Sequence, residues 1–404
     1  MIAGVFIVVY VGMLLGGLPR LRLDRTGIAL LGAIVLLASG AMSPEEAVRA
    51  VDVPTLALLF GLMVVSAQLR LGGFYTRVAQ RLTSHDASPA RLLAAVVLGA
   101  GALSAVFSND IVCLAMTPVL VEVTRRRGLD PFPFLIALAA ASNAGSAATL
   151  IGNPQNMLVG QRTDLSFAGY LLVAGPIALA SLGVTWGVLV LQHRGRWGAT
   201  GSLPTEPGAV PLPRFDRWQT TKGLTVAAVL VALFLAGSHP REIVALGGAG
   251  VLLCSRRLHS RDMLGLVDWQ LLVLFIGLFV VNHALQTTAY PDAAMAALAA
   301  RGMDPSSPGW LFTLVVALSN AISNVPAVML LLPIAEGDAS ARLLAVASTL
   351  AGNLLLVGSV ANLIVADGAE RHGLSLDWKR HARSGVPITL ATLGLAALGL
   401  WIAS

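Results

Sequence analysis

Apolar runs of transmembrane length recur along almost the whole chain, and they restrict the fold class before any single residue does. Residues 170–191 and 386–402 are two examples, and neither contains an acidic or basic side chain. Runs of about 17 to 25 apolar residues suit helices that cross the hydrocarbon core of a bilayer. Charged residues are only 12% of the sequence, about half their share in a typical soluble domain. The sequence therefore predicts an all-α, polytopic membrane protein.

The positions of the basic residues predict the topology. We place the N-terminus outside and let segments 92–122 and 310–335 each enter and leave the membrane on one side. Cytoplasmic loops then hold 22 of the 27 Lys and Arg residues, as the positive-inside rule requires. This predicts an inner-membrane protein with both termini extracytoplasmic, and it explains the net charge of +6 without nucleic-acid binding. The basic residues on the other side are Arg49, Arg162, Arg241, Arg301 and Arg342.

The apolar segments are of two kinds, and together they predict about ten spans and two hairpins. Simple helices are predicted at 3–18, 26–41, 54–70, 168–191, 222–237, 242–255, 269–286 and 384–403. Four other segments carry Asn, Ser, Gly or Pro at their centres, namely 92–122, 132–161, 310–335 and 342–366. Residues 193–221 are rich in Gly, Pro and Thr, which predicts a cytoplasmic linker between two halves.

The two halves resemble each other in sequence. Residues 51–66 and 267–282 are identical at 8 of 16 positions, and Ser108-Asn109 aligns with Ser323-Asn324. Helices 54–70 and 269–286 cross in opposite directions in this topology, which predicts inverted repeats at 1–192 and 222–404. Each repeat comprises scaffold helices, a re-entrant hairpin, a broken helix and a final helix. These parts are 1–91, 92–122, 132–161 and 168–191 in the first repeat and 222–286, 310–335, 342–366 and 384–403 in the second.

Polar residues interrupt both predicted hairpins. An open backbone turn at membrane depth is tolerated only inside protein or beside a water-filled cavity, so these interruptions predict tips that meet in the interior. Helix ends there offer N–H groups, carbonyls and amides to a substrate. We expect the substrate to be bound by Ser108, Asn109, Ser323 and Asn324 at the tips and by Asn156 and Asn362 in the broken helices.

The broken helices supply the predicted site of the coupling ion. Carbonyls freed by unwinding can coordinate Na⁺, although small residues could also serve only close helix packing. The expected ion-site residues are Asp110, Asn143, Gly145, Thr149, Gly152, Asn153, Ser348, Thr349, Asn353 and Gly358.

Asp110 is the single residue for which the sequence makes the most specific functional prediction. A carboxylate at membrane depth costs at least ~2.5 kcal/mol, so it is a functional residue by default. We expect it to bind the coupling cation or proton; the alternative is a protonated structural hydrogen-bond donor. Asp52 and Asp268 are related by the repeat and stand at helix starts, where a carboxylate caps the helix.

The sequence offers little for other kinds of chemistry. It contains no Ser/His/Asp set, no His-rich metal spacing and no Gly-rich nucleotide loop, which disfavours an enzyme and an ATP-driven pump. We expect no cofactor and no metal other than Na⁺ as a coupling ion. Neither tip carries Lys or Arg, so a bound anion would be held by helix ends, amides and hydroxyls.

These motifs resemble those of the ion transporter superfamily, with its divalent anion/sodium symporters, citrate permeases and arsenite efflux permease. The matching residues are Phe107-Ser108-Asn109-Asp110, Thr117-Pro118, Asn143-Ala144-Gly145, the stretch 151–156, and Ile322-Ser323-Asn324-Val325-Pro326. The resemblance implies a scaffold domain that forms a homodimer and a transport domain that moves as an elevator. In the divalent anion/sodium symporters of this superfamily each tip carries Ser-Asn-Thr, whereas this chain has Asp110 and Val325 at the third positions. The Asn-Asp pair is similar to that of the arsenite permease and points toward proton coupling.

The predicted function is transport of a small anion, a carboxylate or oxyanion, coupled to Na⁺ or H⁺. Its predicted partners are that solute, the lipid bilayer and a second copy of the chain. The alternatives are a Na⁺/H⁺ or arsenite-type antiporter, a passive channel and, from another class, an intramembrane enzyme.

Overall fold

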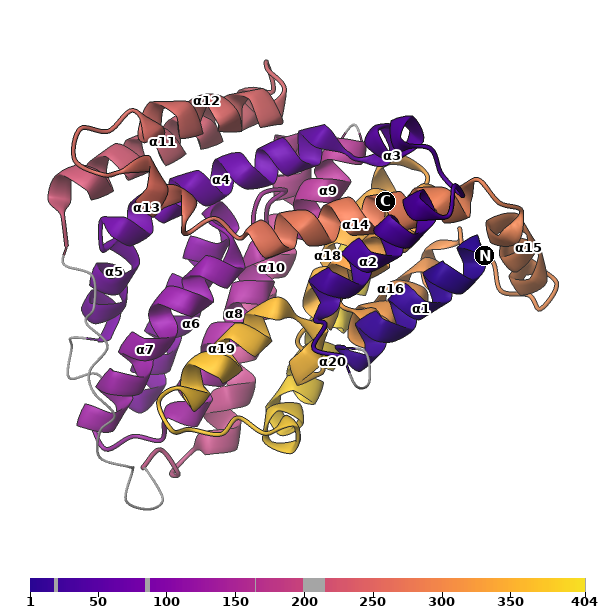
Figure 1. Ribbon diagram of the computed structural model, residues 1–404. Coiled ribbons are helices and arrows are strands. Elements are labelled where there is room, and N and C mark those ends of the chain that lie inside the picture. The colour runs from indigo at the N-terminus through magenta and orange to yellow at the C-terminus, as the bar shows by residue number, and fades with distance from the viewer. Residues whose placement is uncertain (18–20, 84–87, 164, 199–214, 404) are drawn as a thin grey trace.

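Helices form the regular structure of the chain in the computed structural model, which describes residues 1–17, 21–83, 88–163, 165–198 and 215–403 (Figure 1). These residues contain no strand, only an isolated β-bridge between Leu129 and Gly198. The predicted all-α class is confirmed. Residues 199–214 of the predicted linker 193–221 lie outside the described residues.

Ten α-helices precede the linker in the part of the chain that the structure describes. They are α1 (Ile2–Leu15), α2 (Arg25–Ala38), α3 (Pro44–Ala50), α4 (Val53–Leu71), α5 (Phe74–Thr83), α6 (Pro89–Val106), α7 (Asn109–Arg126), α8 (Pro131–Ser146), α9 (Pro154–Arg162) and α10 (Phe167–His193).

Ten α-helices and two short 3₁₀ helices follow it in the described residues. They are α11 (Arg217–Ala236), α12 (Arg241–Leu253), α13 (Ser260–Leu264), α14 (Trp269–Gln286), α15 (Tyr290–Ala299), α16 (Pro308–Ile322), α17 (Asn324–Leu331), η1 (Leu332–Ile334), α18 (Gly337–Ala351), η2 (Leu356–Gly358), α19 (Val360–Glu370) and α20 (Trp378–Ile402).

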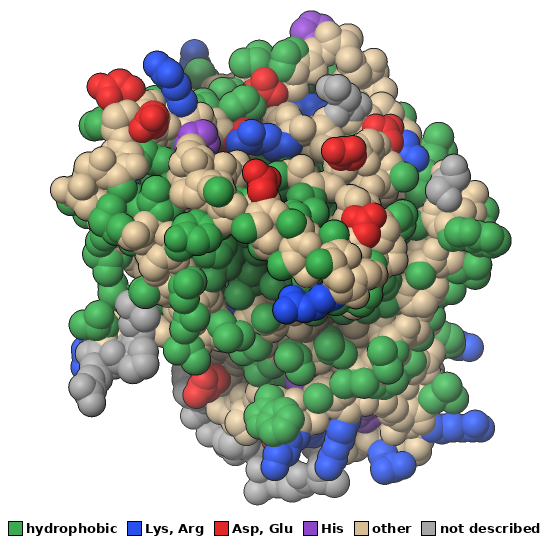
Figure 2. Space-filling view, turned by 90° about the vertical axis from the view of Figure 1, so that its right-hand side faces the viewer, with side chains coloured by type: hydrophobic (Ala, Val, Ile, Leu, Met, Phe, Trp, Pro, Cys, Tyr) green, Lys and Arg blue, Asp and Glu red, His purple; other side chains and the backbone are tan. Residues whose placement is uncertain are grey.

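Six helices in the described part of the chain are long and apolar enough to cross a membrane: α4, α6, α10, α11, α14 and α20. Some of the other predicted spans are shorter; α1 and α2 have 14 residues each, which corresponds to about 21 Å of helix. Apolar side chains face outward on the long helices, with Leu172 76% and Leu390 64% exposed. Figure 2 shows hydrophobic side chains over the middle of one face, with charged groups of both signs above them and mainly basic groups along the lower edge. This surface suits a lipid environment.

Local signals explain most helix boundaries, including those that differ from the prediction. Asp52 accepts a hydrogen bond from the Thr55 amide, and Asp268 accepts one from the Leu271 amide, so both predicted caps are confirmed. The helix predicted at 384–403 begins earlier, at Trp378, because Asp377 caps it. The helix predicted at 3–18 ends at Leu15, since Gly16 takes up a left-handed conformation with φ 73°.

Two pairs of helices bring the halves of the chain together. α2 packs on α14, and α4 packs on α12. A Cβ atom at Gly61 of α4 would lie 2.7 Å from the carbonyl carbon of Ala245, and one at Gly277 of α14 would lie 2.7 Å from that of Ala29. Only glycine permits these backbones to approach so closely. The two glycines occupy aligned positions in the sequence, and each makes its contact with the opposite half.

α8 lies at the centre of the remaining helices. Each of its residues, Pro131–Ser146, is buried, and α6, α7, α10 and α19 all pack against it. α18 is surrounded in a similar way by α16, α17, α20 and α9. The four segments with polar centres are each interrupted near the middle, between α6 and α7, α8 and α9, α16 and α17, and α18 and α19. These interruptions carry the site described next.

Candidate substrate and ion site at the helix breaks

The break between α6 and α7 contacts the break between α8 and α9. The backbone N–H of Asn109 donates to the Gly152 carbonyl at 3.2 Å, and its side-chain amide donates to Asn143 Oδ1 at 3.0 Å. Asn109 is 4% exposed. The first residue of α7 is therefore fixed to both ends of the neighbouring break, inside the protein.

A corresponding contact joins the α16–α17 break to the α18–α19 break. Ser323 stands between α16 and α17 with φ 77° and ψ 160°, a region that residues other than glycine seldom occupy. For the next residue, Asn324, the surrounding oxygen atoms assign the amide nitrogen to the side that faces the Gly358 and Ser348 carbonyls, at 3.1 and 3.0 Å. The opposite orientation would set its oxygen against two other oxygens.

Hydrogen bonds across the two halves connect all four breaks. Asn143 donates to Asn353 Oδ1 at 2.8 Å and to Asn362 Oδ1 at 3.4 Å. The Ser359 hydroxyl donates back to Asn143 Oδ1 at 3.0 Å. Asn143 therefore contacts residues from the α6–α7 break and from the segment that joins α18 to α19, and it is 1% exposed.

Thr349 is the centre of a second group of hydrogen bonds. Its hydroxyl oxygen accepts from Asn153 Nδ2 and Gln155 Nε2, each at 3.2 Å. Its single O–H has two acceptors within reach, Ala345 O of its own helix at 2.8 Å and Asn156 Oδ1 at 3.2 Å. Thr349 belongs to α18 of the second half, whereas Asn153, Gln155 and Asn156 belong to the first half. The polar residues of both halves thus form one buried network.

The remaining predicted residues make mostly local contacts. Asn156 and Asn362 direct their amide nitrogens to carbonyls of their own breaks. The Thr149 hydroxyl donates to Ala105 O at 2.6 Å, and the Ser348 hydroxyl donates to Ala345 O at 3.2 Å. A Cβ atom at Gly145 would lie 2.2 Å from Gly101 O, so this glycine permits close packing of α6 on α8. A similar backbone approach occurs at Gly152, whose Cβ would lie 2.3 Å from Ser146 O. At Gly358 the nearest atom to a Cβ would be the side-chain atom Asn320 Oδ1 at 2.9 Å, and the nearest backbone atom would be Gly352 O at 3.1 Å.

Asp110 and Ser108 lie at the more open side of this region. Both are partly exposed, and Asp110 stands in the first turn of α7, where a negative charge is favoured. Among the described residues, the Asp110 carboxylate has no ion-pair partner. Its carboxylate is thus able to take a cation or a proton.

Several buried oxygen atoms near the breaks have no hydrogen-bond partner within the described structure. They are Ser104 Oγ, Asn109 Oδ1, Ser319 Oγ and Asn320 Oδ1. A buried polar atom without a partner is costly, and oxygen atoms of this kind are suitable ligands for a hard monovalent cation. Ser104 and Ser319 each stand five residues before the tip asparagine of their half.

Sequence reasoning missed some members of the network. Ser146 accepts from Asn153 Nδ2 at 2.9 Å, and Tyr170 donates to Ala147 O at 2.9 Å while accepting from Asn156. Ser146 and Gln155 stand inside a polar stretch that was already recognised, so they could have been found. Tyr170 lies in a different helix, α10, and nothing local marks it.

A buried polar network at the breaks of discontinuous helices is typical of membrane transporters, and comparison with known proteins places the chain in that class. A model of the citrate transporter family, CitMHS, matches residues 10–351. The chain belongs to this family, which confirms the predicted superfamily.

Its relatives include an uncharacterized transporter of Mycobacterium tuberculosis, 29% identical over 94% of each chain. The silicon efflux transporter LSI3 of Oryza sativa subsp. japonica is 28% identical over 94% of this chain and 93% of its own. The inner membrane protein YbiR of Escherichia coli is 29% identical over 86% and 87%.

Among solved structures, the YdaH transporter of Alcanivorax borkumensis superposes with a TM-score of 0.61, covering 100% of this chain and 97% of that one. The two sequences are 16% identical, so this likeness concerns the fold alone.

Proposed function

We propose that this chain moves a small anion, a carboxylate or an oxyanion, across the inner membrane, coupled to Na⁺ or H⁺. The observation that carries the proposal is the junction of four helix breaks in one buried network built from both halves. Amide and backbone N–H groups at such a junction can hold an anion, while oxygen atoms without partners can hold a cation. Membership of the citrate transporter family supports an anionic substrate.

The anion is bound in this proposal by Ser108, Asn109, Ser323 and Asn324. Asn156 and Asn362, whose amide nitrogens donate to carbonyls of their own breaks, hold the helix ends that face the anion. The cation is bound by Asp110 and by the network around Asn143, Asn153, Thr349 and Asn353. Ser104 and Ser319 are added as ligands because their buried hydroxyls have no partner among the described residues. Val325 has no hydroxyl, so the second tip contributes fewer cation ligands than the first.

We further propose that the chain consists of two inverted repeats, each with a re-entrant hairpin, that work by elevator-type alternating access. The order of helices supports this, because α1–α10 and α11–α20 each end in a broken pair followed by a long helix. Two pairs of residues at aligned positions of the two halves add support. One pair is the helix caps Asp52 and Asp268, and the other is the closely packed glycines Gly61 and Gly277. In this scheme α2, α4, α12 and α14 form a scaffold and the broken helices form the moving part.

Orientation and assembly complete the proposal. Both termini are extracytoplasmic, in keeping with the 22 of 27 basic residues assigned to cytoplasmic loops, and the chain forms a homodimer through its scaffold.

A cation/proton antiporter or an arsenite-type exporter is the second candidate. Two observations favour it: Asp110 has no ion-pair partner within the described residues, and one relative is named as a silicon efflux transporter. An intramembrane enzyme has weaker support, since the network contains amides and hydroxyls rather than a nucleophile paired with a base.

Charge movement in proteoliposomes on a solid-supported membrane separates these candidates. Na⁺ or pH would be jumped with and without citrate, succinate, sulfate, phosphate or arsenite. We expect a current that requires both an anion and a cation gradient. A current evoked by the cation jump alone would indicate that the protein is an antiporter rather than a symporter.

A further inference from the structure

A cavity of about 440 Å³ lies between α3 and α14 on one side and α9, α17 and η1 on the other. It is separate from the helix breaks, because none of the network residues described above lines it. One wall is apolar, with Phe279, Met329 and Leu332. The polar residues that line it are Arg49, Arg162, Asn282, His283 and Gln286.

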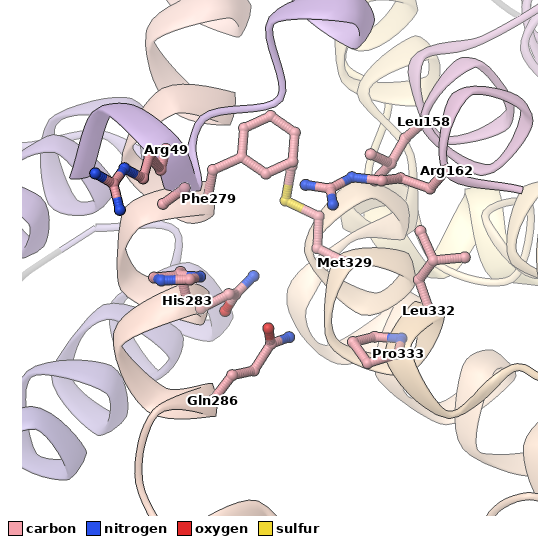
Figure 3. A pocket seen from close by; sticks show the side chains of 11 residues that line it. Arg49, Leu158, Arg162, Phe279, His283, Gln286, Met329, Leu332 and Pro333 are labelled. Carbon is pink, nitrogen blue, oxygen red and sulfur yellow. The ribbon is translucent and has the colours of Figure 1, made fainter. Parts of the chain in front are cut away.

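Hydrogen-bond donors face this space from both sides. Figure 3 shows the Arg162 guanidinium reaching into it from α9, opposite His283 and Gln286 on α14. The Nε atom of Arg162 is paired with Asp52 Oδ2. A guanidinium carries five N–H donors, so its two terminal nitrogens remain for a ligand. The Arg162 side chain is 47% exposed, as a group that receives a ligand from water must be.

Asn282 is a second and independent sign of a ligand. It is 7% exposed, and its Oδ1 atom accepts a hydrogen bond from the Tyr10 hydroxyl at 2.7 Å. Its Nδ2 atom is buried and has no acceptor within the described structure. A buried N–H group without an acceptor is costly, and a negatively charged oxygen in the cavity would supply the missing acceptor.

The charges around the cavity favour an anion. Two guanidiniums line it, and none of the described residues contributes a carboxylate to its lining. Asp52 is already paired with Arg162, and the nearby Glu46, which interacts electrostatically with Arg49 and His283, is held in the capping box of α3. The Arg162 guanidinium lies over the face of the Phe279 ring, with 5.7 Å between the guanidinium carbon and the ring centroid.

We propose that this cavity is a second anion site, which receives the carboxylate or oxyanion on its way to or from the helix breaks. This inference rests on the anion transport proposed above. The cavity suits that task because α17 begins at the Ser323–Asn324 break and ends at the cavity wall. Its eight residues span about 12 Å, so the two sites are one short helix apart.

Protection of an introduced cysteine tests the site without relying on transport. Gln286 is exposed at the cavity, so the reporter is Gln286→Cys in a Cys254→Ser background; Cys113 is buried. The rate of modification by N-ethylmaleimide is measured with citrate, succinate, sulfate or phosphate against gluconate. We expect at least one of the four anions to slow the modification in a saturable manner.

A pair of matched variants separates an anion site from a structural ion pair. Arg162→Gln and Asp52→Asn both remove the pair, and Asn still caps a helix. We expect Arg162→Gln to raise the half-protecting anion concentration about tenfold, since one charge-assisted hydrogen bond is worth roughly that factor. Asp52→Asn should leave it unchanged or lower it. Equal shifts in both variants, or no protection by any of the four anions, would overturn the proposal.

The same measurement distinguishes this inference from the proposed function. Protection that persists in Asn324→Ala, a variant at the helix breaks, would place the anion in a separate site. If the Asn324→Ala variant loses the protection, the anion binds only at the helix breaks, and the proposed second site is wrong. Protection in a protein that generates no current with any anion would support the second site and remove the proposed transport.

Discussion

Asn156 and Asn362 make the same pair of contacts in opposite halves of the chain. Each amide nitrogen donates to the carbonyls of the residues ten and seven positions earlier: Ser146 and Thr149 for Asn156, Gly352 and Leu355 for Asn362. The distances are 3.3 and 3.0 Å in the first half and 2.8 and 3.1 Å in the second. One side chain thus satisfies two carbonyls that each broken helix leaves without a helical partner.

This relationship predicts a structural role that is equal in the two halves. Asn156→Ala and Asn362→Ala should each destabilise the purified protein by about 2–3 kcal/mol, because two buried carbonyls lose their donor. The measurement is thermal unfolding monitored by size-exclusion chromatography in detergent. A normal melting temperature in either variant would mean that another group, or water, satisfies the carbonyls.

The second prediction concerns coupling at Asp110. Asp110→Asn should weaken the dependence of transport current on the Na⁺ or pH gradient about tenfold or more, since coupling free energies are roughly 1–3 kcal/mol. Asp268→Asn is the matched control, because Asn keeps the cap of α14 while removing a carboxylate. Full gradient dependence in Asp110→Asn would assign coupling to another group.

The third prediction concerns the crossing of helices at Gly61 and Gly277. Alanine at either position would place a methyl group 2.7 Å from a backbone carbon of the opposite half. We expect each substitution to cost about 1–3 kcal/mol, the usual range for overpacking. Gly247→Ala is the control, because a Cβ atom there meets nothing within 4 Å. Equal thermal stability of all three variants would contradict this account.

The fourth prediction uses the backbone of Ser323, whose φ of 77° lies in a region suited to glycine. Ser323→Gly and Ser323→Ala both remove the hydroxyl, but only glycine relieves the backbone, by about 1–3 kcal/mol. We therefore expect Ser323→Gly to be the more stable variant in thermal unfolding, while both lose affinity for the transported anion. Equal stability of the two variants would show that this break relaxes in solution.

Much of the fold follows from local signals in the sequence. The polar tips at Asn109 and Asn324 predicted where helices are interrupted, since an open backbone in an apolar run requires polar partners. Asp52 and Asp268 predicted two helix starts for the same kind of local reason. Four short helices, α3, α5, α13 and α15, were not predicted, because they have 5 to 10 residues and their pattern is too short to distinguish from a loop.

The sequence predicted which residues belong to the candidate site better than it predicted which of them contact one another. Asn143 and Thr349 were predicted because they are polar residues within apolar segments. Their hydrogen-bond partners in the opposite half depend on how α8 and α18 pack, which the sequence does not show. Arg162 was assigned only to an extracytoplasmic loop. Its place beside a cavity depends on α14 from the other half, and no spacing along the chain reveals that neighbour.

The packing of α2 on α14 and of α4 on α12 joins the two halves of the chain, and this has a consequence for how the protein folds during its synthesis. Gly61 meets its partner Ala245 only after about 180 further residues have been synthesised, which takes roughly 10–35 seconds at the usual rate of translation. During that interval the surface of α4 around Gly61 lacks the helix that covers it in the finished protein. The two halves therefore complete their packing together rather than one after the other.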